Sequence, residues 1–357
     1  MNLFGFFALY MINNNLFIYF QIKMNSLNTV YKYIEIRYAD PICSLALDEK
    51  SLLFGTMMGR SGYFSIPDKK FFLLSETQNE HISGTQLNKE NQEMFFVSIG
   101  DEEVQIFTKN ESGIPKYESK MNYETDGDHN SKCESCYTLL NDIYLLRVFL
   151  HIPQDNDAEA VTANCDYIVK NIINNECDSG QIEMSNYAVP FDYDGKRFIW
   201  VDFYSNKERA VLLYNFVSKK VTMKEKLNED FGHISHLKLI PNGKFFLVRK
   251  YNICEIRNEK FEIEKTFGHI GKEVLACDFM CNNDKMIIVT LDIDGNVNVY
   301  DYKTDKVERL FNLYDLNSIS QEEKDRQFFS MGYPYYIKVN STYIAVTTDY
   351  GCYIIKR

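Results

Sequence analysis

Metal-binding side chains gather around Cys133 and Cys136, which are separated by two residues. This spacing is one half of a structural zinc site, and His129, Cys165 and Cys177 are of the residue types that complete such sites. Cys165 and Cys177, however, lack the short spacing of a second ligand pair, and a buried strand thiol accounts for Cys165 equally well. We therefore expect free thiols, with no bound metal and no other cofactor.

A second group, formed by His269, Asp294 and Thr290, combines an imidazole, a carboxylate and a hydroxyl. A catalytic relay needs a free nucleophile, whereas Thr290 belongs to an apolar run that is expected to be a packed strand. The same three side chains, together with Tyr300, can instead satisfy one another's hydrogen bonds in a buried structural network. We favour the structural network over the relay.

Motifs of the common enzyme classes are missing from the sequence. It contains no Gly-rich phosphate loop, no Gly-x-Ser-x-Gly elbow and no His-Glu-x-x-His pair. With only six His in 357 residues, few general bases are available. We therefore expect no catalytic residues and no enzymatic activity.

From residue 30 onward the chain repeats one unit, in which a turn rich in Asp, Asn or Gly precedes an apolar run of strand length. The turns begin 41 to 57 residues apart, a period expected for the four-stranded blades of a β-propeller. The seven turns are Asp48-Glu49, Glu90-Asn91, Asn141-Asp142, Asp194-Gly195, Asn242-Gly243, Asn283-Asp284 and Asn340-Ser341.

The apolar runs behind the turns predict the seven inner strands, and each unit then offers a second strand and, in most units, a more polar outer one. The seventh unit ends after its second strand, while residues 30–38 form a strand-like run without a partner. Pairing the two closes the ring and leaves no open edge at its ends. The sequence thus predicts an all-β fold, a single seven-bladed β-propeller over residues 30–357.

The first 22 residues are uncharged and mostly apolar, as in a signal peptide or a membrane anchor. No basic residue precedes the stretch, Asn13, Asn14 and Asn15 interrupt its centre, and no small-x-small cleavage pattern follows before Met24. We expect residues 1–29 to be a hydrophobic extension that need not belong to the fold, with Met24 as an alternative start. A signal anchor and a docked hydrophobic tail are the alternatives.

The composition is typical of a globular chain rich in strand formers. Hydrophobic and charged shares of 45% and 25% exclude global disorder, and 26 Phe and 25 Tyr favour strands. The net charge of −11 opposes non-specific binding to nucleic acid or anionic lipid. Nine scattered Cys favour reduced thiols. We expect a cytoplasmic protein that binds no nucleic acid and meets a membrane only if residues 1–22 are an anchor.

The sixth unit carries the most recognisable residues. Gly268-His269 precedes its inner strand, Asp294-Gly295 forms a tight turn, and the next strand ends in Tyr300-Asp301. This layout resembles the WD-repeat propeller family, whose blades begin near a Gly-His pair and end a strand with Trp-Asp. Gly232-His233 begins the fifth unit in the same way. The resemblance implies a structural role for His269, Thr290, Asp294 and Tyr300.

Two segments, residues 118–134 and 316–328, are longer than blades require, and both are polar and charged. Each is either a partner-binding insertion or a variable exposed connection. The candidate interaction residues are Asp126 and Asp128 in the first segment, Glu322 and Glu323 in the second, and Asp292 and Ile293 beside the Asp294 turn.

We expect a non-enzymatic protein-interaction scaffold or adaptor that belongs to a larger complex and forms no obligate homo-oligomer. Its partners are expected to be other proteins. Two other classes stay open. A propeller enzyme of hydrolase type would need carboxylates or His that converge on the central channel, and a membrane-associated propeller would depend on residues 1–22.

Overall fold

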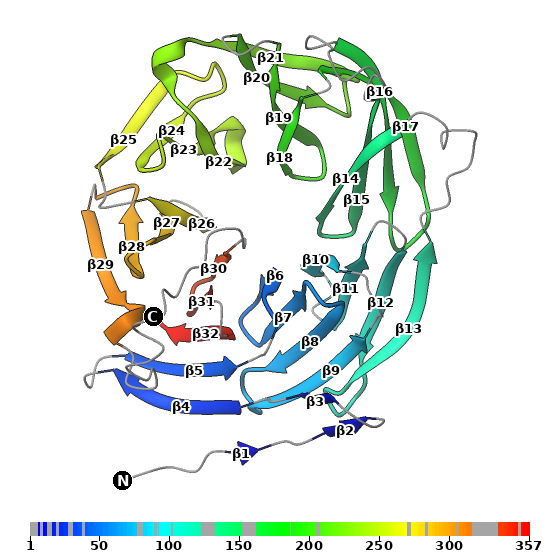
Figure 1. Ribbon diagram of the computed structural model, residues 1–357, viewed down its shortest axis with the longest axis vertical. Helices are drawn as coiled ribbons and strands as arrows, with labels where there is room; N and C mark the ends of the chain where they lie inside the picture. Colours follow the sequence, from blue (N-terminus) through cyan, green and yellow to red (C-terminus); the bar gives the residue numbers. More distant parts are fainter. Residues whose placement is uncertain are drawn as a thin grey trace.

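The computed structural model describes the chain except for residues 1–5, 8–9, 13–15, 19–20, 28–30, 38–39, 77–80, 89–90, 92, 101–102, 123–132, 152–161, 186, 205–207, 270–272, 283–284, 305, 316–334 and 349–350. Seven antiparallel sheets of at least four strands each surround a central axis, as Figure 1 shows. The predicted all-β, seven-bladed propeller is confirmed.

Each sheet is one blade, and its strands follow one another from the axis outward. Blade 1 consists of β6 (Ile42–Leu47), β7 (Ser51–Thr56), β8 (Arg60–Ser65) and β9 (Lys70–Glu76). Blade 2 consists of β10 (Ile82–Leu87), β11 (Met94–Ile99), β12 (Glu103–Lys109) and β13 (Pro115–Asn122). Blade 3 consists of β14 (Cys133–Asn141), β15 (Tyr144–His151), β16 (Thr162–Asn171) and β17 (Cys177–Ser185).

The remaining blades have the same order. Blade 4 consists of β18 (Val189–Tyr193), β19 (Arg197–Phe203), β20 (Arg209–Asn215) and β21 (Lys220–Leu227). Blade 5 consists of β22 (Ile234–Leu239), β23 (Phe245–Arg249), β24 (Ile253–Arg257) and β25 (Ile263–His269). Blade 6 consists of β26 (Val274–Asn282), β27 (Lys285–Asp292), β28 (Asn296–Asp301) and β29 (Lys306–Asn312). Blade 7 consists of β30 (Ile337–Val339), β31 (Tyr343–Thr348), β32 (Gly351–Lys356) and β5 (Tyr31–Arg37).

Helical structure in the described part of the chain is limited to three short 3-10 turns, η2 (Glu229–Phe231), η3 (Pro241–Gly243) and η4 (Leu313–Asp315). Among these described residues, no helix has the length and apolar character needed to cross a bilayer.

The apolar runs behind the predicted turns are the second strands of the blades, so their prediction as the innermost strands was wrong. In β7 all six residues are buried, because neighbouring blades pack against both faces of this strand. The innermost strand precedes each turn and is more polar. For example, β22 reads Ile-Ser-His-Leu-Lys-Leu and buries only three of its six residues. One side of such a strand faces the axis, so its hydrophobic signal is weak.

Asp and Asn side chains stabilise the turns that join the first and second strands. Asp48, Asp194 and Asn340 each accept backbone N–H bonds from the residues two and three positions later, at 2.5 to 3.0 Å. Such local bonds make Asp and Asn favourable in turns, which is why they marked the repeats in the sequence.

Seven hydrophobic clusters fill the spaces between blades, one at each junction. The cluster between blades 7 and 1, for example, joins Ile36 and Ile354 to Ile42 and Phe54, and each of these side chains is 2% exposed or less. Full burial of such a side chain contributes about 1.5–3 kcal/mol. The core is therefore a ring of inter-blade layers.

Ring closure follows the prediction. β5 pairs with β32 in an antiparallel register that sets Arg37 opposite Gly351 and Ile34 opposite Ile354. β4 (Gln21–Leu27) then pairs with the outer side of β5, and β1 (Phe6–Phe7) pairs with β4. A separate hairpin joins β2 (Tyr10–Ile12) to β3 (Leu16–Ile18). The last blade is thus a six-stranded sheet that includes residues before Met24.

The antiparallel topology gives the ring two distinct ends. We call the end with the turns between first and second strands, and between third and fourth strands, the lower face. The upper face carries the turns between second and third strands and the connections from one blade to the next.

Candidate functional site

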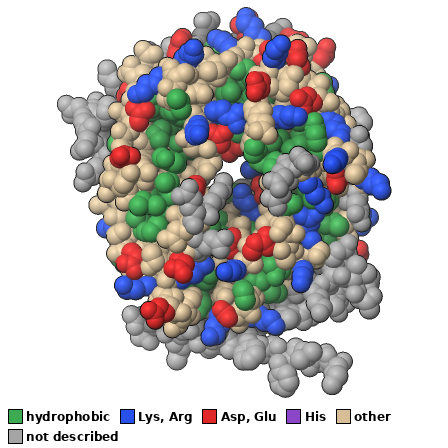
Figure 2. Space-filling view, turned by 180° about the vertical axis from the view of Figure 1, so that it is seen from behind, with side chains coloured by type: hydrophobic (Ala, Val, Ile, Leu, Met, Phe, Trp, Pro, Cys, Tyr) green, Lys and Arg blue, Asp and Glu red, His purple; other side chains and the backbone are tan. Residues whose placement is uncertain are grey.

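Four charged residues occupy the innermost strands of four successive blades, and we call them the axial charges. They are Asp192 in β18, Lys238 in β22, Asp278 in β26 and Lys338 in β30. Each lies between two apolar or weakly polar residues, a pattern that packs the neighbours into the blades and leaves the charge toward the axis. Figure 2 shows one face of the ring hollowed at its centre, with side chains of both charge signs around the hollow.

The two axial aspartates connect neighbouring blades. Asp192 Oδ2 accepts the backbone N–H of Leu239, the residue after Lys238, at 2.8 Å. Asp278 Oδ2 accepts the N–H of Val339, the residue after Lys338, at 3.0 Å. The same bond thus joins blade 4 to blade 5 and blade 6 to blade 7, and it satisfies two backbone donors near the axis.

The axial charges also interact with one another. Lys338 Nζ lies 3.6 Å from Asp278 Oδ1. Burial raises the pKa of the Asp192 carboxyl, while Lys238 and the Leu239 N–H oppose that shift. Burial by itself would lower the pKa of Lys238, but the nearby carboxylates of Asp192 and Asp278 outweigh it and raise the pKa above its ordinary value. Lys238 is therefore charged at neutral pH.

His236, two residues before Lys238, connects blade 5 to blade 6. Its Nε2 lies 3.2 Å from the backbone oxygen of Val274, so this nitrogen carries the proton and donates it. Burial lowers the pKa of His236 to about 4, and Lys238 and His233 also oppose the charged form. The imidazole is therefore neutral at physiological pH.

Carboxylates and an imidazole do converge near the axis, which is the feature that a propeller enzyme would need. Asp192, Asp278 and His236, however, are each bonded to the backbone of the next blade. Burial raises the pKa of Cys277 and of Tyr336 to about 12, so neither neighbour supplies an ionised nucleophile at neutral pH. The bonds of Asp192, Asp278 and His236 connect neighbouring blades at the axis.

The His236 contact predicts a pH-dependent stability. Because the pKa falls from 6.5 in the unfolded chain to about 4 in the fold, the contribution is complete above pH 6.5 and is lost as the pH falls toward 4. The loss is on the order of 3 kcal/mol. Urea unfolding of wild type and His236→Gln at pH 7 and pH 4 should show a smaller pH effect in the variant, which keeps a donor for Val274. The exposed His233→Gln is the control, and an identical pH slope in His236→Gln and wild type would contradict the assignment.

The upper-face turn of blade 5 has an unusual backbone. Lys250 and Tyr251 have φ values of 50° and 67°, in the left-handed region that bulky residues rarely adopt. Blades 1 and 6 place Gly59 and Gly295 in the left-handed positions of the corresponding turns. In blade 5 the Lys250 N–H donates to His233 O, and Tyr251 O accepts from Val274 N, both at 2.8 Å. Bonds to both sides therefore hold the strained turn in place.

This turn displays an aromatic pair on the upper face. The Tyr251 ring is 49% exposed and lies 5.5 Å from the exposed His233 ring, measured between centroids. Gly232 has a φ of 80°, and a Cβ at this position would approach Lys250 Cγ to 2.4 Å. The Gly232-His233 pair therefore positions the turn, because the glycine makes room for Lys250 and the histidine contacts Tyr251.

The polar set predicted in the sixth unit is described in part. Thr290 and Tyr300 are fully buried, and neither hydroxyl forms a hydrogen bond with the residues that the structure describes. Burial raises the pKa of the Tyr300 hydroxyl. Asp294 is half-buried, and its backbone oxygen accepts from Asn312 Nδ2 at 2.9 Å. The side chain of His269 lies outside the described residues. The bonding of His269 to Asp294 thus stays a prediction.

The candidate interaction residues have different surroundings. Asp292 is 1% exposed, and its carboxylate accepts from the N–H and Nδ2 of Asn296 at 2.9 to 3.1 Å. It therefore stabilises the turn from inside, while Ile293 is partly exposed and its N–H donates to Glu273 O at 2.9 Å. The other four candidates, Asp126, Asp128, Glu322 and Glu323, lie outside the described residues.

The cysteines considered as zinc ligands are spread along blade 3. Cys165 is buried and pairs with Ile182, whereas Cys177 is exposed and pairs with Lys170 near the other end of the same two strands. The side chains of Cys133 and Cys136, and all of His129, lie outside the described residues. The described part of the chain contains no cluster of three or more metal-binding side chains.

The axial charges were not predicted, although a signal for them exists. A single charge stands between larger apolar neighbours in Phe191-Asp192-Tyr193, Leu237-Lys238-Leu239 and Ile337-Lys338-Val339. Each triplet lies shortly before one of the predicted turns. An isolated charge in an apolar strand next to a turn would have indicated an innermost strand.

Among the comparisons with known proteins, the one with solved structures supports the fold. The sequence matches no family model and no curated protein. The computationally designed Ika8 protein is similar with a TM-score of 0.53 and 9% identity, over 90% of this chain and 98% of that chain. Raptor from Chaetomium thermophilum is similar with a TM-score of 0.57 and 9% identity, over 89% of this chain and 28% of the Raptor chain. At such identities the similarity shows the fold alone.

Proposed function

We propose that this protein is a non-enzymatic scaffold or adaptor that recognises other proteins and acts as a subunit of a larger cytoplasmic complex. The observation that carries the proposal is the upper-face turn of Lys250 and Tyr251. A half-exposed tyrosine on a strained turn, held by bonds on both sides, loses little conformational entropy on binding. Tyrosine is also enriched among the residues that dominate protein interfaces.

A second exposed group supports recognition at the upper face. Met57 and Met58 occupy the corresponding turn of blade 1 and are 41% and 60% exposed. Flexible thioether side chains adapt to different partner surfaces. We assign both turns, of Lys250-Tyr251 and of Met57-Met58, to the recognition surface.

We further propose that the chain is a divergent member of the WD-repeat family. The supporting observation is positional. Gly232-His233 directly precedes β22, Asp294-Gly295 lies in the turn between the second and third strands of blade 6, and Tyr300 lies in the third strand. These are the places that the family layout gives to Gly-His, Asp-Gly and Trp.

The scaffold proposal predicts that Tyr251→Ala removes partners without affecting stability. Truncation of an interface tyrosine costs about 2 kcal/mol or more, which is roughly a 30-fold loss of affinity. Tagged wild-type and variant proteins should be purified from their native cells and the co-purifying proteins quantified by mass spectrometry. We expect a specific set of partners to be depleted at least tenfold, with an unchanged melting temperature.

Val307→Ala is the matched control, because Val307 is 50% exposed but lies on the outermost strand of blade 6. Unchanged partner recovery with both Tyr251→Ala and Met58→Ala would refute the recognition surface. A hydrolase activity that survives purification and disappears in Asp192→Asn would replace the scaffold by an enzyme, since Asp192 is one of the two axial carboxylates.

A further inference from the structure

Five of the described turns between third and fourth strands repeat one hydrogen bond on the lower face, so the residues at the position it defines can be compared between blades. In five of the described turns an Asn or Asp side chain accepts the N–H of the residue two positions later, at 2.9 to 3.0 Å. The residues at this second position are Ser112, Ile173, Val217, Lys260 and Lys303 in blades 2 to 6.

Blades 3 and 4 depart from the polar pattern of the other turns. Ile173 and Val217 are 50% and 78% exposed, whereas blades 2, 5 and 6 hold Ser or Lys at the same position. Among the five turns with this hydrogen bond, only those of blades 3 and 4 carry an exposed aliphatic side chain at the second position. Single exposed apolar residues are common, so the repetition of one at the same turn position in two neighbouring blades is the feature that singles out this part of the lower face.

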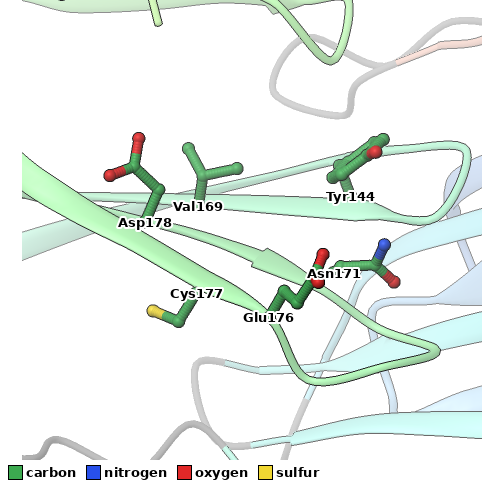
Figure 3. Close-up of a pocket in the computed structure, with 6 residues that line it drawn as sticks. All are labelled: Tyr144, Val169, Asn171, Glu176, Cys177 and Asp178. Atoms are coloured by element: carbon green, nitrogen blue, oxygen red, sulfur yellow. The ribbon is translucent and has the colours of Figure 1, made fainter.

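A pocket of about 420 Å³ is lined by six residues of blade 3 (Figure 3), among them Asn171 and Glu176 from the turn that carries Ile173. Asp178 at this pocket binds Lys219 of blade 4, with Oδ1 and Nζ 2.6 Å apart, and the Tyr144 ring lies close to Gly195 of blade 4. A pocket of this volume accepts a large side chain. The lining residues are Tyr144, Val169, Asn171, Glu176, Cys177 and Asp178.

The lining combines apolar and acidic groups. Val169 and Asp178 pair across β16 and β17 and point to the same side of the sheet, whereas Cys177 points to the other side (Figure 3). Tyr144 and Val169 supply the apolar part. The only charged lining residues are the carboxylates of Glu176 and Asp178.

The two carboxylates are available to a basic partner group. The Asp178–Lys219 pair is exposed, with side-chain exposures of 44% and 56%, so it contributes little and can exchange its cation. Glu176 forms no ion pair with any residue that the structure describes. The net charge of −11 attracts a basic partner as well.

We propose that this lower-face site docks a segment of a partner protein in which an aliphatic or aromatic residue stands next to Lys or Arg. The apolar anchor fills the pocket against Tyr144 and Val169, the exposed Ile173 and Val217 on the same face offer further apolar contacts, and the cation binds Glu176 and Asp178. The proposal rests on the scaffold function and adds a second surface, opposite to the Tyr251 turn, with a partner of defined chemistry.

The test uses the full chain, immobilised, and a phage library of random heptapeptides. Selection is run in parallel on wild type, on the double variant Ile173→Asp/Val217→Asp, and on Ser112→Asp/Lys260→Asp, which changes the same turn position in blades 2 and 5. We expect wild type and the control to enrich peptides with an apolar residue beside Lys or Arg. A synthetic peptide of the enriched sequence should bind the site variant at least tenfold more weakly in fluorescence polarisation.

Two further variants separate the outcomes. Glu176→Gln should weaken the peptide several-fold and reduce the salt dependence of binding, because it removes one charge. Tyr251→Ala should leave peptide binding unchanged, so failure of the upper-face proposal is distinguishable from failure of this one.

Enrichment of acidic or uncharged peptides, no enrichment, or equal binding to the site variant would overturn the proposal. Sedimentation that shows a dimer lost in Ile173→Asp/Val217→Asp would also overturn it, since a second copy would then be the occupant.

Discussion

Replacing Glu255 with alanine is expected to lower the free energy of unfolding by about 3–5 kcal/mol, the usual cost of removing one partner from a buried ion pair. Glu255 is completely buried in β24. Its Oε1 accepts from Arg249 Nε at 2.7 Å, and its Oε2 accepts from Arg257 Nε and Nη2 at 2.9 and 2.7 Å. Without the carboxylate, two guanidinium groups of like charge would face each other in blade 5.

The surroundings of Arg257 increase this cost. Arg257 is 9% exposed, its Nη1 donates to Phe261 O at 2.7 Å, and its guanidinium carbon lies 4.9 and 4.7 Å from the ring centroids of Phe231 and Phe261. These contacts prevent the cation from turning into water. Arg249 is the last residue of β23, directly before the Lys250–Tyr251 turn, so Glu255→Ala is also expected to weaken partner binding there.

Urea unfolding followed by the fluorescence of Trp200, the single tryptophan, measures the effect. Glu255→Gln is the conservative variant and should cost less, because its amide oxygen still accepts one bond. Arg249→Ala should cost less than Glu255→Ala, since its side chain is 19% exposed and makes a single bond to the carboxylate. A cost below about 1 kcal/mol for Glu255→Ala would mean that the triad does not stabilise blade 5.

Removing residues 1–39 is expected to lower the melting temperature by about 10 °C or more and to cause oligomerisation, because several kcal/mol of burial and strand pairing are lost. β5 supplies the fourth strand of blade 7, and Ile36 is completely buried at the junction with blade 1. Its loss leaves the edge of β32 unpaired. Open strand edges pair with other chains.

The matched control is removal of residues 1–20, which keeps β4 and β5 and their pairing with β32. This shorter deletion should remain monomeric and melt close to the full chain in differential scanning calorimetry and sedimentation. Ile36→Asp in the full chain is a second probe of the junction, since it buries an unpaired charge. Equal melting temperatures for the full chain and for residues 40–357 would contradict the closure of the ring by β5.

Local features of the sequence were sufficient for the architecture. Asp48, Asp194 and Asn340 bond their own neighbouring backbone, so each turn is encoded within a few residues and could be recognised without the fold. The seven copies and the unpaired strand of residues 30–38 then required a closed ring. The count of strands in the last unit, rather than any motif, predicted the pairing of β5 with β32.

The innermost strands were missed because their environment is created by the ring. A strand with one side toward the axis carries residues such as His236 and Lys238, and these resemble a solvent-exposed connection in the sequence. Only the assembled blades bury such residues and supply partners for them from the next blade. The bonds of Asp192 to Leu239 and of His236 to Val274 join residues 47 and 38 positions apart.

The amino-acid sequence by itself determined the all-β fold class, the number of blades and the closure of the ring. Turn hydrogen bonds and the burial pattern of a strand both depend on residues only a few positions apart, so they can be recognised in the sequence. The tertiary structure alone decided which polar groups became functional candidates. Asp292 is enclosed and Asp294 half-exposed in one turn, and Ile173 and Val217 occupy the same position of the third-to-fourth-strand turns in adjacent blades. Burial, pKa and proximity depend on neighbours distant in sequence, and no local pattern contains them.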